Sequence, residues 1–349
     1  MKKTHVVAVA VAAILIVAVA VGVALVNSSS PSQSQGSGQL SVMGTDPAVA
    51  AQGVTDATLQ YSSVQAHTAG SSMASGWTQV SGSGSLDLMA GQGTATTLAT
   101  SKVNAGTYDA FRFDVDSVKV TYQGEEYTAT SATTTVTAQS QSRVEVNSSS
   151  SATALVDLRT FVVNTGSSSS PQFIFSASAA ATAVPSSALL SVSVQIGSTA
   201  DLSAQAWWNA FISETSTNVQ VQGTVSGGAM HLTVQNTGSA DADVQAVVVS
   251  PVSASLVSST TLPSSLSGSA VFTVNSAGSF QQTASLQSSA LVSSGATVAS
   301  DSSANFTYNG TISLDFGSAV ANVTVVTGQE YLVTVIGANT YANAIVVAS

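Results

Sequence analysis

Apolar and polar side chains alternate in short runs along most of the chain after residue 40. Residues 111–122, FRFDVDSVKVTY, show the pattern most clearly, because Phe111, Phe113 and Val115 alternate with charged residues. A period of two is typical of a strand with one buried face. Gln123-Gly124 and then EEYTAT follow this run. The sequence therefore predicts a β-hairpin that turns at Gln123-Gly124.

Similar runs on both sides of Pro185 predict an all-β protein. They are DATLQYSSVQAHTA, SRVEVN, TALVDLRTFVV and PQFIFSASA before it, and NVQVQGTV, MHLTVQNTG, DVQAVVVSP, SAVFTVN, GTISLDF, ANVTVVT, EYLVTVIG and NAIVVAS after it. Short strands at this spacing favour two β-sandwich (Ig-like) domains, at residues 40–185 and 186–349. The one candidate helix is 201–214, with Asp201 able to cap its first turn.

The N-terminus carries a different pattern, a run of 21 residues from Val6 to Val26 without a charged side chain. As a helix this run would be about 31 Å long, which matches the ~30 Å hydrocarbon thickness of a bilayer. Lys2 and Lys3 precede it, so residues 1–5 are expected to stay in the cytoplasm. We expect a transmembrane signal-anchor helix at 6–26 and a flexible Ser/Gln/Gly linker at 27–39.

A cleaved signal peptide is the alternative interpretation of this leader, with Ala18-Val19-Ala20 as its small-residue cleavage site. Cleavage there would leave the apolar stretch VGVALV at the start of the mature chain. Both interpretations place the rest of the chain outside the cell. The anchor interpretation makes it a single-pass protein of the cell membrane.

Charge is scarce in the exported part. Charged residues are 7% of the chain, against a typical ~25%. Without Lys2 and Lys3 there remain five basic and 17 acidic residues, a formal charge of −12, and no Lys or Arg follows Arg159. Such a surface offers little to phosphates, so nucleic acid is excluded as a partner. The absence of cysteine excludes thiolate metal sites and haem attachment, and no cofactor is expected.

Several stretches, taken in order, resemble a known prokaryotic surface module. They are GQLSVMGTDPAVAAQGVTDATLQYSSVQAH, GWTQVSGSGSLDLMA, AGTYDAFRFDVDSVKVTYQGEEY and TALVDLRTFVV. Together they resemble domain-of-unknown-function family 4382 over residues ~38–185. The resemblance implies an exported, β-sandwich-like domain and no particular activity. More loosely, LTVQNTGSADADVQAVVV is similar to Ig-like adhesion repeats of archaeal and bacterial surface proteins.

Catalytic residues are hard to find. Outside the leader the histidines are His67 and His231, and no G-x-S-x-G motif occurs. A nucleophile needs a base beside it, and the abundant serines would lie near a histidine only by chance. His67 ends the run QYSSVQAH and is expected at a strand end or on the surface. We therefore expect no enzymatic activity.

Four acids around the predicted hairpin are weak candidates for a metal site. Asp114 and Asp116 share a strand face, and Glu125 and Glu126 follow the turn, so their oxygens could hold Ca²⁺. The other interpretation is a solvated face on which Arg112 and Lys119 pair with acids across the strands.

Two further groups are candidates for contact or modification. Trp207, Trp208 and Phe211 form an aromatic cluster that could bind a sugar or a partner if exposed, or close the second core if buried. Sequons for N-glycosylation begin at Asn27, Asn147, Asn305, Asn309 and Asn322.

These observations predict a membrane-anchored extracellular protein with a structural or adhesive role and no catalysis. The membrane, through residues 6–26, is the first expected partner, and other surface proteins or glycans are the next. The alternatives are a glycan- or Ca-binding surface module and a subunit of a surface filament joined by strand exchange.

Overall fold

The protein is all-β in the part that its structure, a computed structural model, describes. Within that part it contains strands and one short 3₁₀ helix, η2 (Ser288–Leu291), and no helix there is long and apolar enough to cross a bilayer. The all-β prediction is confirmed, while the segment 6–26 and residues 27–35 of the linker lie outside the described residues. The structure describes residues 36–45, 48–90, 94–185, 199–201, 217–252, 262, 265–291, 295–315, 323–337 and 340–349.

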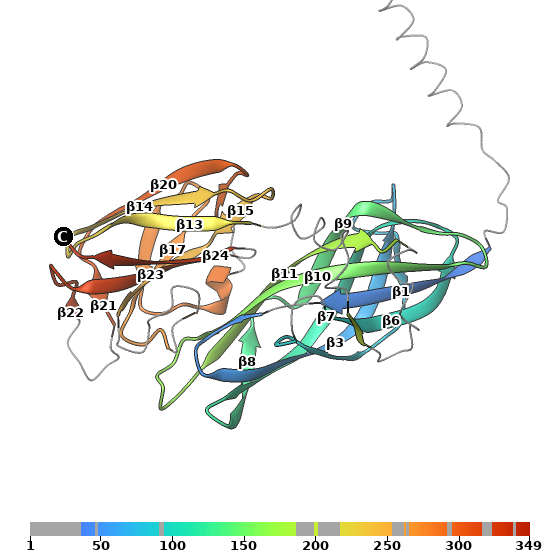
Figure 1. The fold of residues 1–349 in the computed structure, drawn as a ribbon, viewed down its shortest axis with the longest axis horizontal. Helices are drawn as coiled ribbons and strands as arrows, with labels where there is room; N and C mark the ends of the chain where they lie inside the picture. Colours follow the sequence, from blue (N-terminus) through green and yellow to red (C-terminus); the bar gives the residue numbers. More distant parts are fainter. Residues whose placement is uncertain are drawn as a thin grey trace, which may run out of the picture. The chain divides into compact units, whose positions relative to one another are not determined.

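Twelve strands form one hydrogen-bonded sheet in the N-terminal half, in the order β12-β6-β1-β10-β11-β8-β7-β3-β4 (Figure 1). In addition, β2 pairs with β10, β5 with β3, and β9 with both β11 and β7. The strands are β1 (Ser37–Thr45), β2 (Val49–Ala50), β3 (Val54–Thr68), β4 (Trp77–Gln79), β5 (Gly84–Asp87), β6 (Thr94–Asn104), β7 (Gly106–Tyr122), β8 (Glu125–Ser131), β9 (Thr135–Val146), β10 (Ser151–Asn164), β11 (Phe173–Ala183) and β12 (Thr199–Asp201).

The predicted hairpin is present as β7 and β8. Tyr122 pairs with Glu125, so Gln123 and Gly124 form a two-residue turn. Both residues have positive φ, 53° and 87°. This is the backbone of a type I′ turn, whose twist matches that of the flanking strands. Glycine adopts such a φ without steric cost, which explains its place here.

One face of this sheet encloses a single apolar core. Phe111, Phe113 and Val118 of β7 share it with Leu98 of β6, although β6 and β7 lie far apart in the strand order. The hydroxyl of Tyr61 on β3 donates to the carbonyl oxygen of Leu98 over 2.9 Å. The sheet therefore folds over, so that distant strands face each other across the same core.

The C-terminal half is built mainly from a three-stranded sheet, β13-β14-β20, and a five-stranded sheet, β18-β17-β16-β23-β24 (Figure 1). Two short pairs, β15-β19 and β21-β22, accompany them. The strands are β13 (Val219–Val225), β14 (Ala229–Asn236), β15 (Ala242–Val244), β16 (Ala246–Pro251), β17 (Ala270–Val274), β18 (Phe280–Thr283), β19 (Ala296–Val298), β20 (Ser302–Asn309), β21 (Ser313–Leu314), β22 (Val323–Thr324), β23 (Glu330–Gly337) and β24 (Thr340–Val347).

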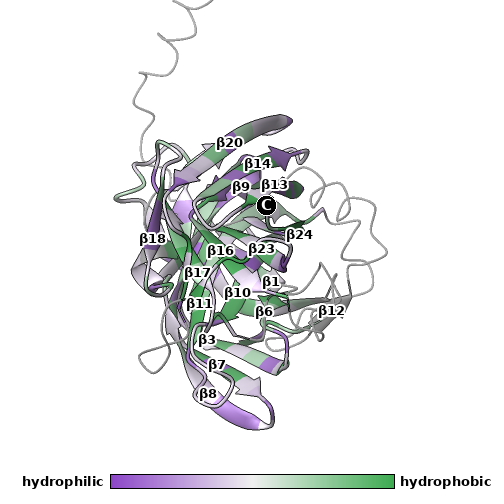
Figure 2. Cartoon of the chain, turned by 90° about the vertical axis from the view of Figure 1, so that its left-hand side faces the viewer, coloured by the Kyte–Doolittle hydropathy of each residue, from purple (hydrophilic) through white to green (hydrophobic). Residues whose placement is uncertain are grey.

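A second core lies between these two sheets. Leu232 and Val234 of β14 pack in the same cluster as Val247 of β16 and Val333 of β23. Alternate residues of the strands point into it, as the period of two predicts. In Figure 2 green, apolar segments run along β16 and β17, whereas the β7–β8 hairpin in the other half ends in purple.

A third apolar cluster joins the two halves of the chain. Phe161 and Val163 of β10 lie in it together with Val248 of β16 and Ile336 of β23. Backbone bonds accompany it, because Leu266 N donates to the Asn164 carbonyl oxygen over 2.8 Å. Ser37–Ser349 accordingly form one compact unit.

Most predicted strands are present, and the differences have local reasons. Ser37–Gln39, predicted as linker, belong to β1, because their backbone pairs with β6 and overrides a weak strand propensity. Of the runs GTISLDF and ANVTVVT, the described strands are the two-residue β21 and β22. Asp201 ends β12, and the rest of the predicted helix 201–214 lies outside the described residues.

Ile336 provides a test of the third cluster. Its side chain is fully buried there, so Ile336→Ala should lower the free energy of unfolding by about 2–5 kcal/mol. Because the cluster couples the halves, calorimetry should still show one unfolding transition, shifted to lower temperature. Val347→Ala, at a 58% exposed position, is the control and should change stability by less than ~0.5 kcal/mol. Two separate transitions, only one of them shifted, would contradict the coupling.

Candidate functional site

The buried histidine at the end of β3 organises one group of candidate residues. His67 is 1% exposed, so the expected strand-end position is right and the expected surface position is wrong. The loop 69–76 and Trp77 of β4 cover the ring, whose centroid lies 5.0 Å from that of Trp77. Gly76 in this loop has φ 81°, and a Cβ there would lie 2.5 Å from Ser71 Cβ, so only glycine lets the loop close.

Both ring nitrogens of His67 are engaged. Nδ1 lies 2.6 Å from Asp109 Oδ1, and Nε2 lies 3.0 Å from the carbonyl oxygen of Ser72. A carbonyl oxygen only accepts, so Nε2 carries a hydrogen and donates it. Burial alone would lower the pKa of His67, but the hydrogen bonds to Asp109 and Ser72 and the charge of Asp109 raise it overall. His67 therefore fastens the loop to the sheet and has no free nitrogen for a general base.

Arg112 and Trp77 lie beside this histidine on the same sheet. The Arg112 guanidinium carbon is 4.1 Å from the centroid of the Trp77 ring, a cation–π contact. Arg112 Nε donates to Gln65 Oε1 over 2.8 Å, and Gln65 Nε2 donates to Gln79 Oε1 over 3.2 Å. The indole nitrogen of Trp77 donates to the Met73 carbonyl oxygen. The guanidinium is thus held in one orientation by stacking and by an amide.

The other histidine stands apart. His231 is exposed on β14, between Thr224 of β13 and Thr307 of β20. The structure does not bring the two histidines together, and His231 gains no acid partner among the described residues.

The four acids proposed for a metal site each have a different neighbour. Asp114 accepts from Thr135 Oγ1 over 2.9 Å, and Asp116 accepts from Ser62 Oγ over 2.8 Å. Glu125 accepts from the Tyr127 hydroxyl, and Glu126 pairs with Lys119 at 3.0 Å. In the described part of the chain no three acids or histidines gather as metal ligands. Of the ion pairs predicted across the strands, the one at Lys119 is present, with Glu126 as its partner.

Sequence reasoning missed one buried acid, Asp157 on β10. Its side chain is 4% exposed, and it pairs with Arg159, whose Nε lies 3.6 Å from Oδ2. Burial raises the pKa of Asp157 to about 6, and the charge of Arg159 offsets part of this rise. The signal in the sequence was a single acid inside the apolar run TALVDLRTFVV.

The remaining predicted residues divide between exposed and undescribed positions. Asn147 follows β9, and Asn305 and Asn309 lie on β20, all three exposed. Asn305 Oδ1 also accepts from Thr233 Oγ1 over 2.8 Å. Trp207, Trp208, Phe211, Asn27 and Asn322 lie outside the described residues.

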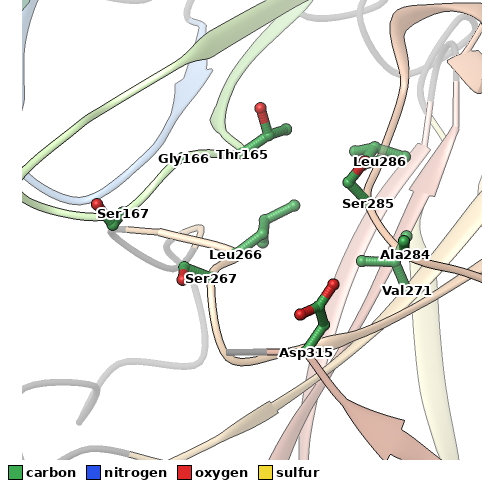
Figure 3. A pocket seen from close by; sticks show the side chains of 10 residues that line it. All are labelled: Thr165, Gly166, Ser167, Leu266, Ser267, Val271, Ala284, Ser285, Leu286 and Asp315. Atoms are coloured by element: carbon green, nitrogen blue, oxygen red, sulfur yellow. The ribbon is translucent and has the colours of Figure 1, made fainter. Parts of the chain in front are cut away.

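A small pocket lies between the loop after β10 and the loops around β17 (Figure 3). Its volume is about 180 Å³. The Asp315 carboxylate points into the space next to Leu266 and Ser285 (Figure 3). Hydroxyl groups of Thr165, Ser167, Ser267 and Ser285 add to the lining, and no base is among the lining residues that the structure describes. The lining suits a small neutral or cationic group and disfavours an anion.

One comparison with known proteins matches a family model to the first part of the chain. Residues 37–176 match the model of "Domain of unknown function (DUF4382)", which confirms the resemblance that the motifs predicted. The search of curated proteins found no match.

Among solved structures, the chain matches a DUF3823 family protein from Parabacteroides merdae at 9% identity. The match covers 90% of this chain and 99% of that one, with a TM-score of 0.18. We draw nothing on fold or function from so low a score.

The two raised pKa values predict how stability depends on pH. The folded state binds a proton more tightly than the unfolded chain at both groups. The stabilisation at Asp157 is therefore lost as pH rises from ~4 through about 6, and that at His67 is lost above ~6.5. Asp157 alone accounts for a loss of about 3 kcal/mol in the free energy of unfolding over this pH range, since each pKa unit corresponds to ~1.4 kcal/mol.

We expect the thermal midpoint to fall by several degrees between pH 4 and pH 8, measured by circular dichroism. Asp157→Asn should remove the lower part of this slope and His67→Gln the upper part. Asp301→Asn, at an exposed acid, is the matched control and should keep the full slope. A midpoint that drops when the pH is lowered from 6 to 4 would show the assignment to be wrong.

Proposed function

We propose that the protein is a single-pass membrane protein whose residues 40–349 lie outside the cell and act by contact, in a structural or adhesive role, without catalysis. The apolar run 6–26 behind Lys2 and Lys3 supports the anchor and its orientation. The match of residues 37–176 to a domain of unknown function is compatible with this role and adds no activity to it.

The observation that carries the proposal of a role without catalysis is the burial and hydrogen bonding of His67. General bases in enzymes need a free nitrogen or oxygen near the substrate. His67 is buried and both of its ring nitrogens are already engaged, by Asp109 and by the Ser72 carbonyl oxygen. The surface, in contrast, is rich in uncharged hydrogen-bonding side chains, which suit contact with other polar molecules.

The proposed architecture has two β-sandwich domains, 40–185 and 186–349, although β12 (Thr199–Asp201) of the second segment pairs with β6 in the sheet of the first. Two separate apolar clusters support it, one made of residues from Leu40 to Ala181 and one made of residues from Val221 to Ala348. The third cluster packs the two against each other, so we propose that they work as one body and not as beads on a string.

Intact cells provide the test of location. A broad-specificity protease added outside should cleave residues 40–349 and leave the leader with the membrane. Trypsin is a built-in control, because it has no site after Arg159 and should therefore leave residues 160–349 uncut. Recovery of a mature chain that starts near Val21 in the medium would contradict the anchor.

A variant without His67 and His231 tests the absence of catalysis. In cells that lack the protein, the double variant His67→Gln/His231→Gln should restore surface attachment as fully as the wild type when equal amounts reach the surface. The comparison is made below the thermal midpoint of the variant, because His67 stabilises the fold. Normal folding together with lost function would contradict the contact role.

A further inference from the structure

We propose that Arg112, stacked on Trp77, binds the carboxylate groups of an acidic polysaccharide. The inference deepens the contact role proposed above and rests on it. Arg112 has no ion pair among the described residues, in a chain with 17 acids and seven bases. Lys119 pairs with Glu126 and Arg159 with Asp157, whereas no described acid lies within ion-pair distance of the Arg112 guanidinium.

The geometry leaves one edge of the guanidinium for a ligand. Nε is used by Gln65, and one face of the group lies on the Trp77 ring. The two terminal nitrogens then form the free end of the fork, whose spacing matches the two oxygens of a carboxylate. Because stacking and the amide already fix the side chain, binding costs little conformational entropy.

Arg143 shows the difference between a held and a free arginine. Arg143 lies on β9, is exposed, and makes no side-chain hydrogen bond among those found in the described residues. It carries the same charge as Arg112 without the stacking ring or the orienting amide. It therefore serves as the matched control for charge alone.

The surroundings of Arg112 favour a sugar over a peptide as the carrier of the carboxylate. Gln79, Gln65, Arg112 and Thr137 form one row across β4, β3, β7 and β9, because each is directly paired with the next. Gln79 and Thr137 are exposed. Amides and hydroxyls beside the guanidinium match the hydroxyls of a sugar chain, because both can donate and accept hydrogen bonds. Peptide-binding surfaces use buried apolar anchors instead, and this row contains none.

Asp114 is an acid close to Arg112 in the sequence, and its charge weakens the attraction of anions to this site. It is on the same strand as Arg112, two residues away, and accepts a hydrogen bond from Thr135. Its charge opposes diffuse attraction of anions, as does the net charge of −10. A ligand must therefore make the directed, two-oxygen contact with Arg112, which selects carboxylates in a fixed geometry.

Binding of the full chain, in a mild non-ionic detergent, to immobilised polygalacturonate tests the proposal. Dextran, which is neutral, and poly-L-glutamate, which carries carboxylates on a peptide, are the comparison surfaces. The wild type should bind polygalacturonate about tenfold more tightly than either. Arg112→Gln should weaken this binding about tenfold and Arg112→Lys nearly as much, because lysine lacks the planar fork. Arg143→Gln should stay within about twofold of the wild type.

Gln65→Glu adds a variant that keeps Arg112 in place. The new carboxylate would pair with the guanidinium, so polygalacturonate binding should fall at least fivefold while circular dichroism shows an intact fold. This variant decides the question if Arg112→Gln fails to fold.

Equal losses in Arg112→Gln and Arg143→Gln would overturn the proposal, as would no binding of polygalacturonate by the wild type. Equal binding to poly-L-glutamate would overturn the assignment to a sugar. None of these results affects cleavage of residues 40–349 on intact cells, so failure here is distinct from failure of the proposed function.

Discussion

β10 is buried on both of its faces, and much of the described structure depends on this. Val156 and Leu158 point into the first core, while Phe161 and Val163 point into the cluster shared with the C-terminal half. A strand buried on both sides has no solvated face to carry charge. The run TALVDLRTFVV is therefore almost continuously apolar, and its one acid, Asp157, has a strongly raised pKa.

Several of the few ionisable groups of the sheet hold other side chains or loops in place. Asp109 holds His67, and His67 in turn holds the loop that carries Met73 and leads into Trp77. Trp77 then supports Arg112. These contacts form a chain from the His67–Asp109 hydrogen bond to the guanidinium of Arg112, so the same residues stabilise the fold and shape the surface. We propose that the ionisable groups of this sheet serve structure and contact.

Local patterns were enough to predict much of the fold. Alternation in FRFDVDSVKVTY and the Gln123-Gly124 turn predicted β7 and β8 because period and turn chemistry act over a few residues. The sequence resemblance over residues ~38–185 likewise predicted the family, whose model matches residues 37–176. Packing between segments that are distant in the sequence could not be predicted from these local patterns. His67 looked like a surface residue because its cover, the loop 69–76, has no apolar pattern of its own.

The Arg112 site could not be predicted for the same reason. Gln65, Trp77 and Arg112 come from three strands, and only the pairing of β3 with β4 and β7 brings them together. For the suggested calcium ligands, the structure separates residues that are close in the sequence. Neighbours in sequence, Asp114 and Asp116 turn to hydroxyls on different strands, Thr135 of β9 and Ser62 of β3.

Nitrogen-15 NMR of the histidine rings tests the central claim most directly. If His67 is a structural ion, both of its ring nitrogens should be protonated at pH 6.5, because its pKa is raised above the ordinary histidine value of ~6.5. A neutral His67 with an unprotonated Nε2 at that pH would contradict the account and make this histidine available as a base.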